Sequence, residues 1–195
     1  MAGLRDRLVF DAEGGTVRDG ARRYVLMRPD VLMGAFARLE PKARSMALDA
    51  FAASAEEHGG DSLAAYFASV GGDASALLDA TAAAAADLGW GRWSFRRDGD
   101  GLRLTVTGSP FAHGFVAAAA DGPAEPVCTP IRGLLAAAAR LVLASRASPG
   151  TAGAPAAPAA LGAAAADRVD TEELACSACG HPCCEFIARR RAHRA

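Results

Sequence analysis

The chain has 195 residues, of which 51% are hydrophobic and 22% are charged, a composition that fits a globular protein with a real core. Lysine and arginine number 21 against 22 aspartates and glutamates, so no net field would draw the chain to nucleic acid or to an anionic membrane. The charged first residues exclude a secretory signal and no apolar run is long enough to cross a bilayer, so we expect a cytoplasmic location.

The first part of the chain is predicted to form two short strands and then helices. The strands are RLVFD at 7–11 and RRYVLMRP at 22–29, with the turn-rich stretch 12–20 between them. Proline suits the first turn of a helix, aspartate can cap a helix start, and glycine often ends a helix. These start and stop residues predict four helices, at 29–40, 41–60, 61–72 and 73–89.

The pattern changes at Trp90, where strands become the main prediction. Residues 90–97 and 102–109 alternate apolar and polar side chains around DGDG, which is typical of a β-hairpin. Residues 109–120 predict a short helix or a wide loop. Residues 126–145 predict a longer helix, which carries Cys128 at its beginning.

The last part of the chain is predicted to contain a flexible insert and two strands. The stretch 146–166 is rich in alanine, proline and glycine and has no periodic apolar face, which indicates the insert. Strands are expected at 167–176 and 183–190. Together the elements predict one α+β domain over 1–195, in which N-terminal helices pack on an antiparallel sheet. Its parts are the N-terminal strands and helices at 1–59 and the core at 60–190.

Four of the five cysteines lie within nine positions near the C-terminus: Cys176, Cys179, Cys183 and Cys184. In a reducing compartment such a cluster indicates metal or redox work rather than structural disulfides. A local zinc knuckle could use His181 as a further ligand. However, the neighbours Cys183 and Cys184 would point to opposite faces of an extended segment, so both rarely bind one ion.

Three other interpretations of the cluster stay open. Cys176 and Cys179 form a CxxC pair, which in redox proteins usually lies at a helix start, whereas here Gly180 and Pro182 follow and disfavour a helix. An iron–sulfur cluster would need four thiolates with freer spacing. The cysteines could also be small buried apolar residues with no further role.

A ligand set that reaches outside the cluster fits a tetrahedral ion better. Cys128 lies in the tight stretch PVCTP, remote in the sequence from Glu173, Cys176 and Cys184. Together these residues offer three sulfurs and one oxygen from two segments, and Cys184 returns after a turn at 180–182. Such a site would join the last helix to the final strands, so we expect its role to be structural.

This region resembles the 4-vinyl reductase (4VR) domain family. The resemblance covers about residues 60–190 and is carried by GWGRW at 89–93, SPFA at 109–112, PVC at 126–128 and the motif E-x-x-C-x-x-x-G-H-x-x-C-x-F. Here that motif consists of Glu173, Cys176, Gly180, His181, Cys184 and Phe186. The family includes the aromatic-sensing domains of phenol- and xylene-responsive transcription activators and stand-alone hydrocarbon-binding proteins.

The resemblance implies a fold related to small trafficking-complex subunits and haem-based nitric oxide sensors, in which helices and an antiparallel sheet enclose an apolar pocket. It also implies a zinc ion held by Cys128, Glu173, Cys176 and Cys184, with Cys179 and Cys183 as bystanders. The sensors carry a pocket tryptophan where this chain has RLTVTG at 103–108, so the resemblance does not extend to phenol itself as the ligand.

The first functional hypothesis is a zinc-stabilised domain that binds a small hydrophobic or aromatic molecule, as sensor or carrier, without chemistry of its own. It would form a homodimer and, if it signals, would act on a separate protein partner. An apolar ligand needs a concave, mostly hydrophobic cavity with few polar groups. The candidate walls are aromatic side chains: Tyr66, Phe67, Trp90, Trp93, Phe95, Phe111 and Phe115.

Two alternative functions stay open. The family takes its name from a protein linked to vinyl reduction of chlorophyll precursors, which suggests a tetrapyrrole-handling or vinyl-reductase accessory factor in (bacterio)chlorophyll synthesis. The sequence has no glycine-rich dinucleotide motif, so a reduction would need an outside electron source. The other alternative is a structural dimer subunit.

Overall fold

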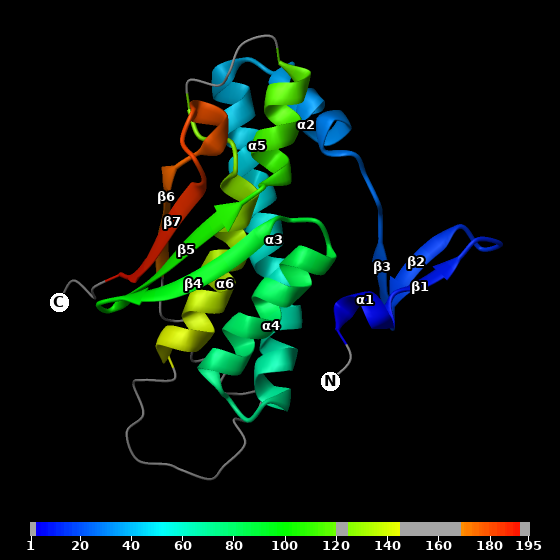
Figure 1. Cartoon of the computed structure of the whole chain (residues 1–195), viewed down its shortest axis with the longest axis vertical. Helices are drawn as coiled ribbons and strands as arrows, with labels where there is room; N and C mark the ends of the chain where they lie inside the picture. Colours follow the sequence, from blue (N-terminus) through cyan, green and yellow to red (C-terminus); the bar gives the residue numbers. More distant parts are fainter. Residues whose placement is uncertain (1–2, 120–124, 145–168, 192–195) are drawn as a thin grey trace.

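The computed structural model describes residues 3–119, 125–144 and 169–191, and it places helices against a twisted antiparallel sheet (Figure 1). The predicted α+β class is confirmed. The helices are α1 (Leu4–Arg7), α2 (Pro29–Ala37), α3 (Pro41–Ser69), α4 (Ala74–Asp87), α5 (Pro110–Ala118) and α6 (Thr129–Ala144), with a 3-10 turn η1 (Ser177–Cys179). The strands are β1 (Val9–Asp11), β2 (Thr16–Asp19), β3 (Arg22–Tyr24), β4 (Arg92–Asp98), β5 (Gly101–Thr107), β6 (Val169–Ala175) and β7 (Cys184–Arg190).

The larger sheet has the strand order β4-β5-β7-β6, and every neighbouring pair in it is antiparallel. The predicted hairpin forms β4 and β5, and β7 returns from far along the chain to pair with β5, with Leu104 opposite Phe186. Leu102, Leu104 and Val106 alternate along β5 and are fully buried. One face of the sheet therefore forms the core, because side chains alternate between the two faces of a strand.

Helix α6 lies between this sheet and α3, and it contacts both. Small residues allow the two helices to approach closely. A Cβ atom added to Gly133 of α6 would lie 2.0 Å from the carbonyl oxygen of Ala52 in α3. The alanines at 136–139 are all buried in the same helix. The small side chains of this helix therefore serve close packing.

This packing predicts opposite outcomes for two glycine-to-alanine changes on the α3–α6 pair. Gly133→Ala is expected to destabilise the protein by about 1–3 kcal/mol, because backbone atoms that cannot move aside occupy the space of the new methyl group. At Gly60 the added Cβ would meet only the Cβ of Ala137, at 3.4 Å. At Gly60 the higher helix propensity of alanine, worth up to about 1 kcal/mol, should therefore offset the cost of the close contact. Thermal unfolding of both variants checks this prediction. An equal loss of stability in the two variants would contradict it.

The predicted helix end at 59–60 is wrong, since α3 runs without a break from Pro41 to Ser69. Gly59 and Gly60 lack the positive φ that a glycine stop uses, and they instead face Leu134 and Ala137 of α6. The helix ends before Gly71 and Gly72, whose φ values are 67° and 79°. The glycine pair at 59–60 therefore reflects contact between helices.

The N-terminal region also differs from the prediction. The stretch 12–20, predicted as a turn, contains β2, which pairs with β1 and β3 in a separate three-stranded antiparallel sheet. The predicted strand at 22–29 ends at Tyr24, which pairs with Val17 of β2. The chain then runs extended to α2, and Figure 1 shows the small sheet standing beside the main body.

The remaining helix predictions agree with the structure. Asp73 caps α4 by accepting hydrogen bonds from the backbone N–H groups of Ser75 and Ala76. Within the stretch 109–120, predicted as a short helix or a wide loop, Pro110–Ala118 form helix α5. In the part of the chain that the structure describes, no helix is both long and apolar enough to span a membrane. The predicted insert at 146–166 lies outside the described residues.

Candidate metal centre

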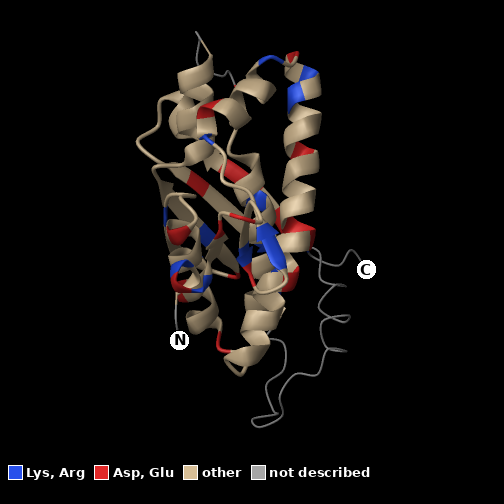
Figure 2. Ribbon diagram, turned by 90° about the vertical axis from the view of Figure 1, so that its right-hand side faces the viewer, with Lys and Arg blue, Asp and Glu red and all other residues tan. Residues whose placement is uncertain are grey.

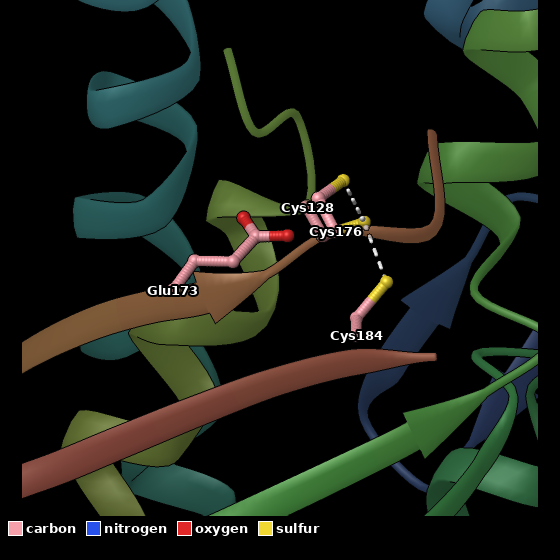
Figure 3. A group of neighbouring side chains, drawn as sticks. All are labelled: Cys128, Glu173, Cys176 and Cys184. Atoms are coloured by element: carbon pink, nitrogen blue, oxygen red, sulfur yellow. Dashed lines mark hydrogen bonds between the residues drawn. The ribbon is translucent and has the colours of Figure 1, made fainter. Parts of the chain in front are cut away.

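Four side chains from three separate segments meet at one end of the main sheet (Figure 3). Cys128 directly precedes α6, Glu173 belongs to β6, Cys176 directly follows β6, and Cys184 is the first residue of β7. One potential ligand atom from each of them lies within 4.8 Å of all the others, and the three cysteines are buried. These are the four residues that the sequence predicted as metal ligands.

The spacing of the sulfur atoms suits a tetrahedral metal ion. The Sγ atom of Cys128 lies 3.5 Å from Sγ of Cys184 and 3.9 Å from Sγ of Cys176. A metal–sulfur bond of about 2.3 Å in a tetrahedron puts two sulfurs about 3.8 Å apart. The observed separations lie on both sides of that value. The group could therefore hold a metal ion with little rearrangement.

The turn after β6 decides which cysteines join the group. The backbone N–H groups of Cys179 and His181 both donate to the carbonyl oxygen of Cys176, and Gly180 adopts a φ of 90°. This tight reversal returns the chain so that Cys184 faces Cys176, while Cys179 and His181 are exposed. Cys183 is half-buried and outside the group. The turn thus separates the four predicted ligands from the two predicted bystander cysteines.

The carboxylate of Glu173 is an orphaned buried group. Neither of its oxygens is accessible to solvent, and neither has a hydrogen-bond partner among the described residues. Burial is the main cause that raises the pKa of Glu173 to about 9. An unpaired buried carboxylate is costly, and a bound cation would remove that cost. The residues therefore fit a metal ion by a criterion independent of spacing.

The thiols of the group hold different charges when no metal is bound. Hydrogen bonds from Cys128 and Cys176 lower the pKa of Cys184 to about 3, so this sulfur is a thiolate at neutral pH. Hydrogen bonds with Cys176 and Cys184, together with burial, raise the pKa of Cys128. The metal-free centre thus keeps protons on Cys128 and on Glu173, and a cation would have to displace them.

Two serines contact the sulfur atoms, and sequence reasoning did not find them. The hydroxyl of Ser109 lies 3.1 Å from Sγ of Cys128, and Ser109 is itself buried. Both the backbone N–H and the hydroxyl of Ser177 lie within 3.3 Å of Sγ of Cys184. Such contacts orient ligands and stabilise thiolates. The only sequence signals were the position of Ser109 in SPFA and of Ser177 within the CxxC pair.

The structure divides the seven predicted pocket residues between two parts of the core. Trp93, Phe111 and Phe115 are buried in the main core, and Trp90 and Phe95 pack against it. Tyr66 and Phe67 instead pack around a smaller group of Leu77, Leu141 and Val142. The seven residues therefore do not line one common space.

A chain of aromatic contacts links part of this set to residues that the sequence analysis missed. The ring centre of Phe111 lies 5.1 Å from that of Trp90 and 6.0 Å from that of Phe51, both in edge-to-face geometry. Phe51 in turn stacks on Phe36 at 6.1 Å. We call Phe36, Phe51, Trp90 and Phe111 the aromatic cluster. Phe36 and Phe51 lay in helices whose packing partners the sequence did not reveal.

Comparisons with known proteins place the fold but not a family. No protein-family model and no curated protein matches the sequence. Among solved structures, the chain is similar to the phenol-responsive sensory domain of the transcription activator PoxR with phenol, with a TM-score of 0.69 and 16% identity over 96% of this chain and 86% of that one. The chain is also similar to a trafficking protein particle complex subunit 3 from Naegleria fowleri, covalently bound to palmitic acid. The TM-score is 0.44 and the identity is 11%, over 84% of this chain and 95% of that one.

Proposed function

We propose that the protein binds a small hydrophobic molecule, as a sensor or carrier, and catalyses no reaction of its own. The observation that carries this proposal is a fold shared along nearly the whole chain with a sensory domain that responds to phenol. At 16% identity the ligand need not be the same. The proposed assignment to the 4VR family rests on the sequence motifs, and the proposed single domain over 1–195 rests on the same resemblance.

We propose zinc as the ion of the metal centre. Three thiols and one carboxylate are a soft, sulfur-rich set, and tetrahedral sites of this kind suit Zn²⁺. The ion would join the beginning of α6 to both C-terminal strands, because its ligands come from all three segments. Its role would then be structural, since four protein ligands leave no open position for a substrate.

We propose that the aromatic cluster, with the neighbouring Trp93, forms the wall that contacts the apolar ligand. Its rings come from α2, α3 and α5 and from the segment before β4. Aromatic rings offer large apolar contact area with few polar groups, as ligand pockets require. Tyr66 and Phe67 lie in the other part of the core, so we assign them to packing.

We also propose a homodimer that passes any signal to a separate protein partner. The segment between β3 and α2 exposes three consecutive apolar side chains, with exposed fractions of 75% for Val25, 70% for Leu26 and 55% for Met27. Such a run is unusual for a monomer and is typical of an interface. A second copy would cover it.

Native mass spectrometry of the freshly purified full chain tests these proposals in one spectrum. The expected result is a dimer with about one zinc per chain that carries, or takes up, a small apolar molecule. The chain's two tryptophans, Trp90 and Trp93, both lie at the proposed pocket, so ligand binding should also change the intrinsic fluorescence. Trp90→Phe should remove most of that change.

Other outcomes of this experiment favour the alternatives. A coloured protein with a bound pigment would support the tetrapyrrole-handling factor. A colourless dimer that binds none of a panel of toluene, phenol and medium-chain alcohols would support a structural subunit. Either result would contradict the proposed ligand, while the zinc content is read independently of both.

A further inference from the structure

We infer that the protein has a binding site for a small monocarboxylate, in a cleft between the beginning of α3 and the segment that leads into α6. The cleft has a volume of about 120 Å³. Its lining combines apolar side chains with a cation and hydroxyl groups: Pro41, Arg44, Ser45, Leu48, Glu125, Pro126, Val127 and Thr129. This site goes beyond the function proposed above, because it requires neither the metal ion nor the apolar ligand.

Arg44 supplies the cation of the cleft. Its guanidinium lies 5.1 Å from the centre of the Phe115 ring, over the ring face. Among the described residues it has no carboxylate partner, whereas Arg132 and Arg140 of the facing helix α6 pair with Asp49 and Glu56 of α3. A guanidinium stacked on a ring keeps its N–H edge free to bind a planar carboxylate with two hydrogen bonds.

The charge pattern of α3 favours an anion at this end of the helix. Lys42 and Arg44 occupy its first turns, Glu40 directly precedes the helix, and the acidic residues within the helix lie further along (Figure 2). The cleft also adjoins the first residue of α6, a helix of 16 residues. The partial positive charge of a helix N-terminus adds to the attraction for an anion placed beside it.

Thr129 is a second polar group of the cleft. This residue is only 8% exposed and lines the cleft. Its hydroxyl would donate a hydrogen bond to an oxygen of a carboxylate bound by Arg44.

The remaining walls select the kind of anion. Leu48 and Val127 are buried and apolar, and Pro41 and Pro126 add further apolar surface, so the ligand should have a hydrocarbon body. The exposed carboxylate of Glu125 at the same cleft repels any anion, and it repels phosphate and other multiply charged anions more strongly than an anion with a single charge. The chemistry therefore fits a small aromatic or branched aliphatic acid with a single negative charge.

The test is a titration of the isotopically labelled full chain with benzoate, followed by NMR chemical shifts. Benzamide, which has the same shape without the charge, is the control ligand. Benzoate should shift signals of 41–48 and 125–129 and bind at least about tenfold more tightly than benzamide. Arg44→Gln should weaken benzoate binding about tenfold and leave benzamide unchanged. Thr129→Val, which keeps the side-chain shape, should weaken benzoate about threefold.

Arg96→Gln is the matched control, since Arg96 is exposed on β4 outside the lining of the cleft, and it should leave both affinities unchanged. Zinc content and melting temperature are measured for each variant, because Val127 and Thr129 flank Cys128. Equal affinity for benzoate and benzamide would overturn the inference. So would benzoate binding that Arg44→Gln does not weaken, or shifts confined to other residues. If Arg44→Gln does not fold, unchanged benzoate binding by Thr129→Val overturns it.

Discussion

Replacing Cys128 by serine is expected to empty the metal centre and to lower the melting temperature by about 10 °C. Of the four candidate ligands among the described residues, Cys128 alone lies on the α6 side, so its loss should disconnect the helix from the strands. Binding energy at a structural metal site is folding energy, and losing about 4 kcal/mol of it in a chain of this size corresponds to that shift. Metal analysis and calorimetry of the purified variant check both parts.

Cys183→Ser is the matched control for Cys128→Ser. It removes a half-buried thiol next to a ligand, yet Cys183 is not a member of the group of four. The metal content should stay at about one ion per chain and the melting temperature should change little. If Cys183→Ser loses the metal and Cys128→Ser keeps it, the ligand set assigned here is wrong.

Replacing Glu173 by glutamine is expected to weaken zinc binding by about 100-fold and yet to stabilise the metal-free protein. Glutamine is a poor zinc ligand, so the ion loses its oxygen donor. Without metal, however, the buried carboxylate of Glu173 has no hydrogen-bond partner among the described residues. A neutral amide of the same shape avoids the free-energy cost of a buried, unpaired negative charge. Chelator competition gives the affinity, and thermal unfolding in the presence of a chelator gives the stability.

The gain in the metal-free Glu173→Gln protein should depend on pH. The pKa of Glu173 is raised from an ordinary 4.5 to about 9 in the folded chain, chiefly by burial. The folded form therefore holds this proton when the unfolded form has lost it, and wild-type stability falls as the pH rises from about 4.5 to about 9. The advantage of the variant should grow across that window, and an advantage that shrinks with rising pH would contradict this account.

The same groups make metal binding a proton-releasing event. At pH 7 the metal-free centre holds protons on Glu173 and Cys128, and the ion must displace them, so acidification should weaken binding. Glu173→Gln should release one proton fewer than the wild type. Calorimetry in two buffers with different ionisation enthalpies measures this number directly.

Local patterns were enough to predict the elements whose signals are local. The hairpin around DGDG, the cap at Asp73 and the helix beginnings at Pro29 and Pro41 all appear in the structure, because turn geometry and capping depend on a few neighbouring residues. The glycines at 59–60 were misread for the same reason. A glycine that ends a helix and one that lets another helix approach look alike in the sequence.

Residue chemistry and order were enough to select Cys128, Glu173, Cys176 and Cys184 as a candidate ligand set, because few side chains suit a soft metal ion and their spacing limits the combinations. Only the tertiary structure decided that β7 lies between β5 and β6. It brings the sulfurs of Cys176 and Cys184 within 3.9 Å of that of Cys128, and it leaves the buried carboxylate of Glu173 without a hydrogen-bond partner among the described residues. It also places the two serines against the sulfurs. It also decided that Arg44, from another helix, lines a cleft with Thr129. Those relations are set by contacts between distant segments, and such contacts depend on how whole elements pack rather than on any short stretch of sequence.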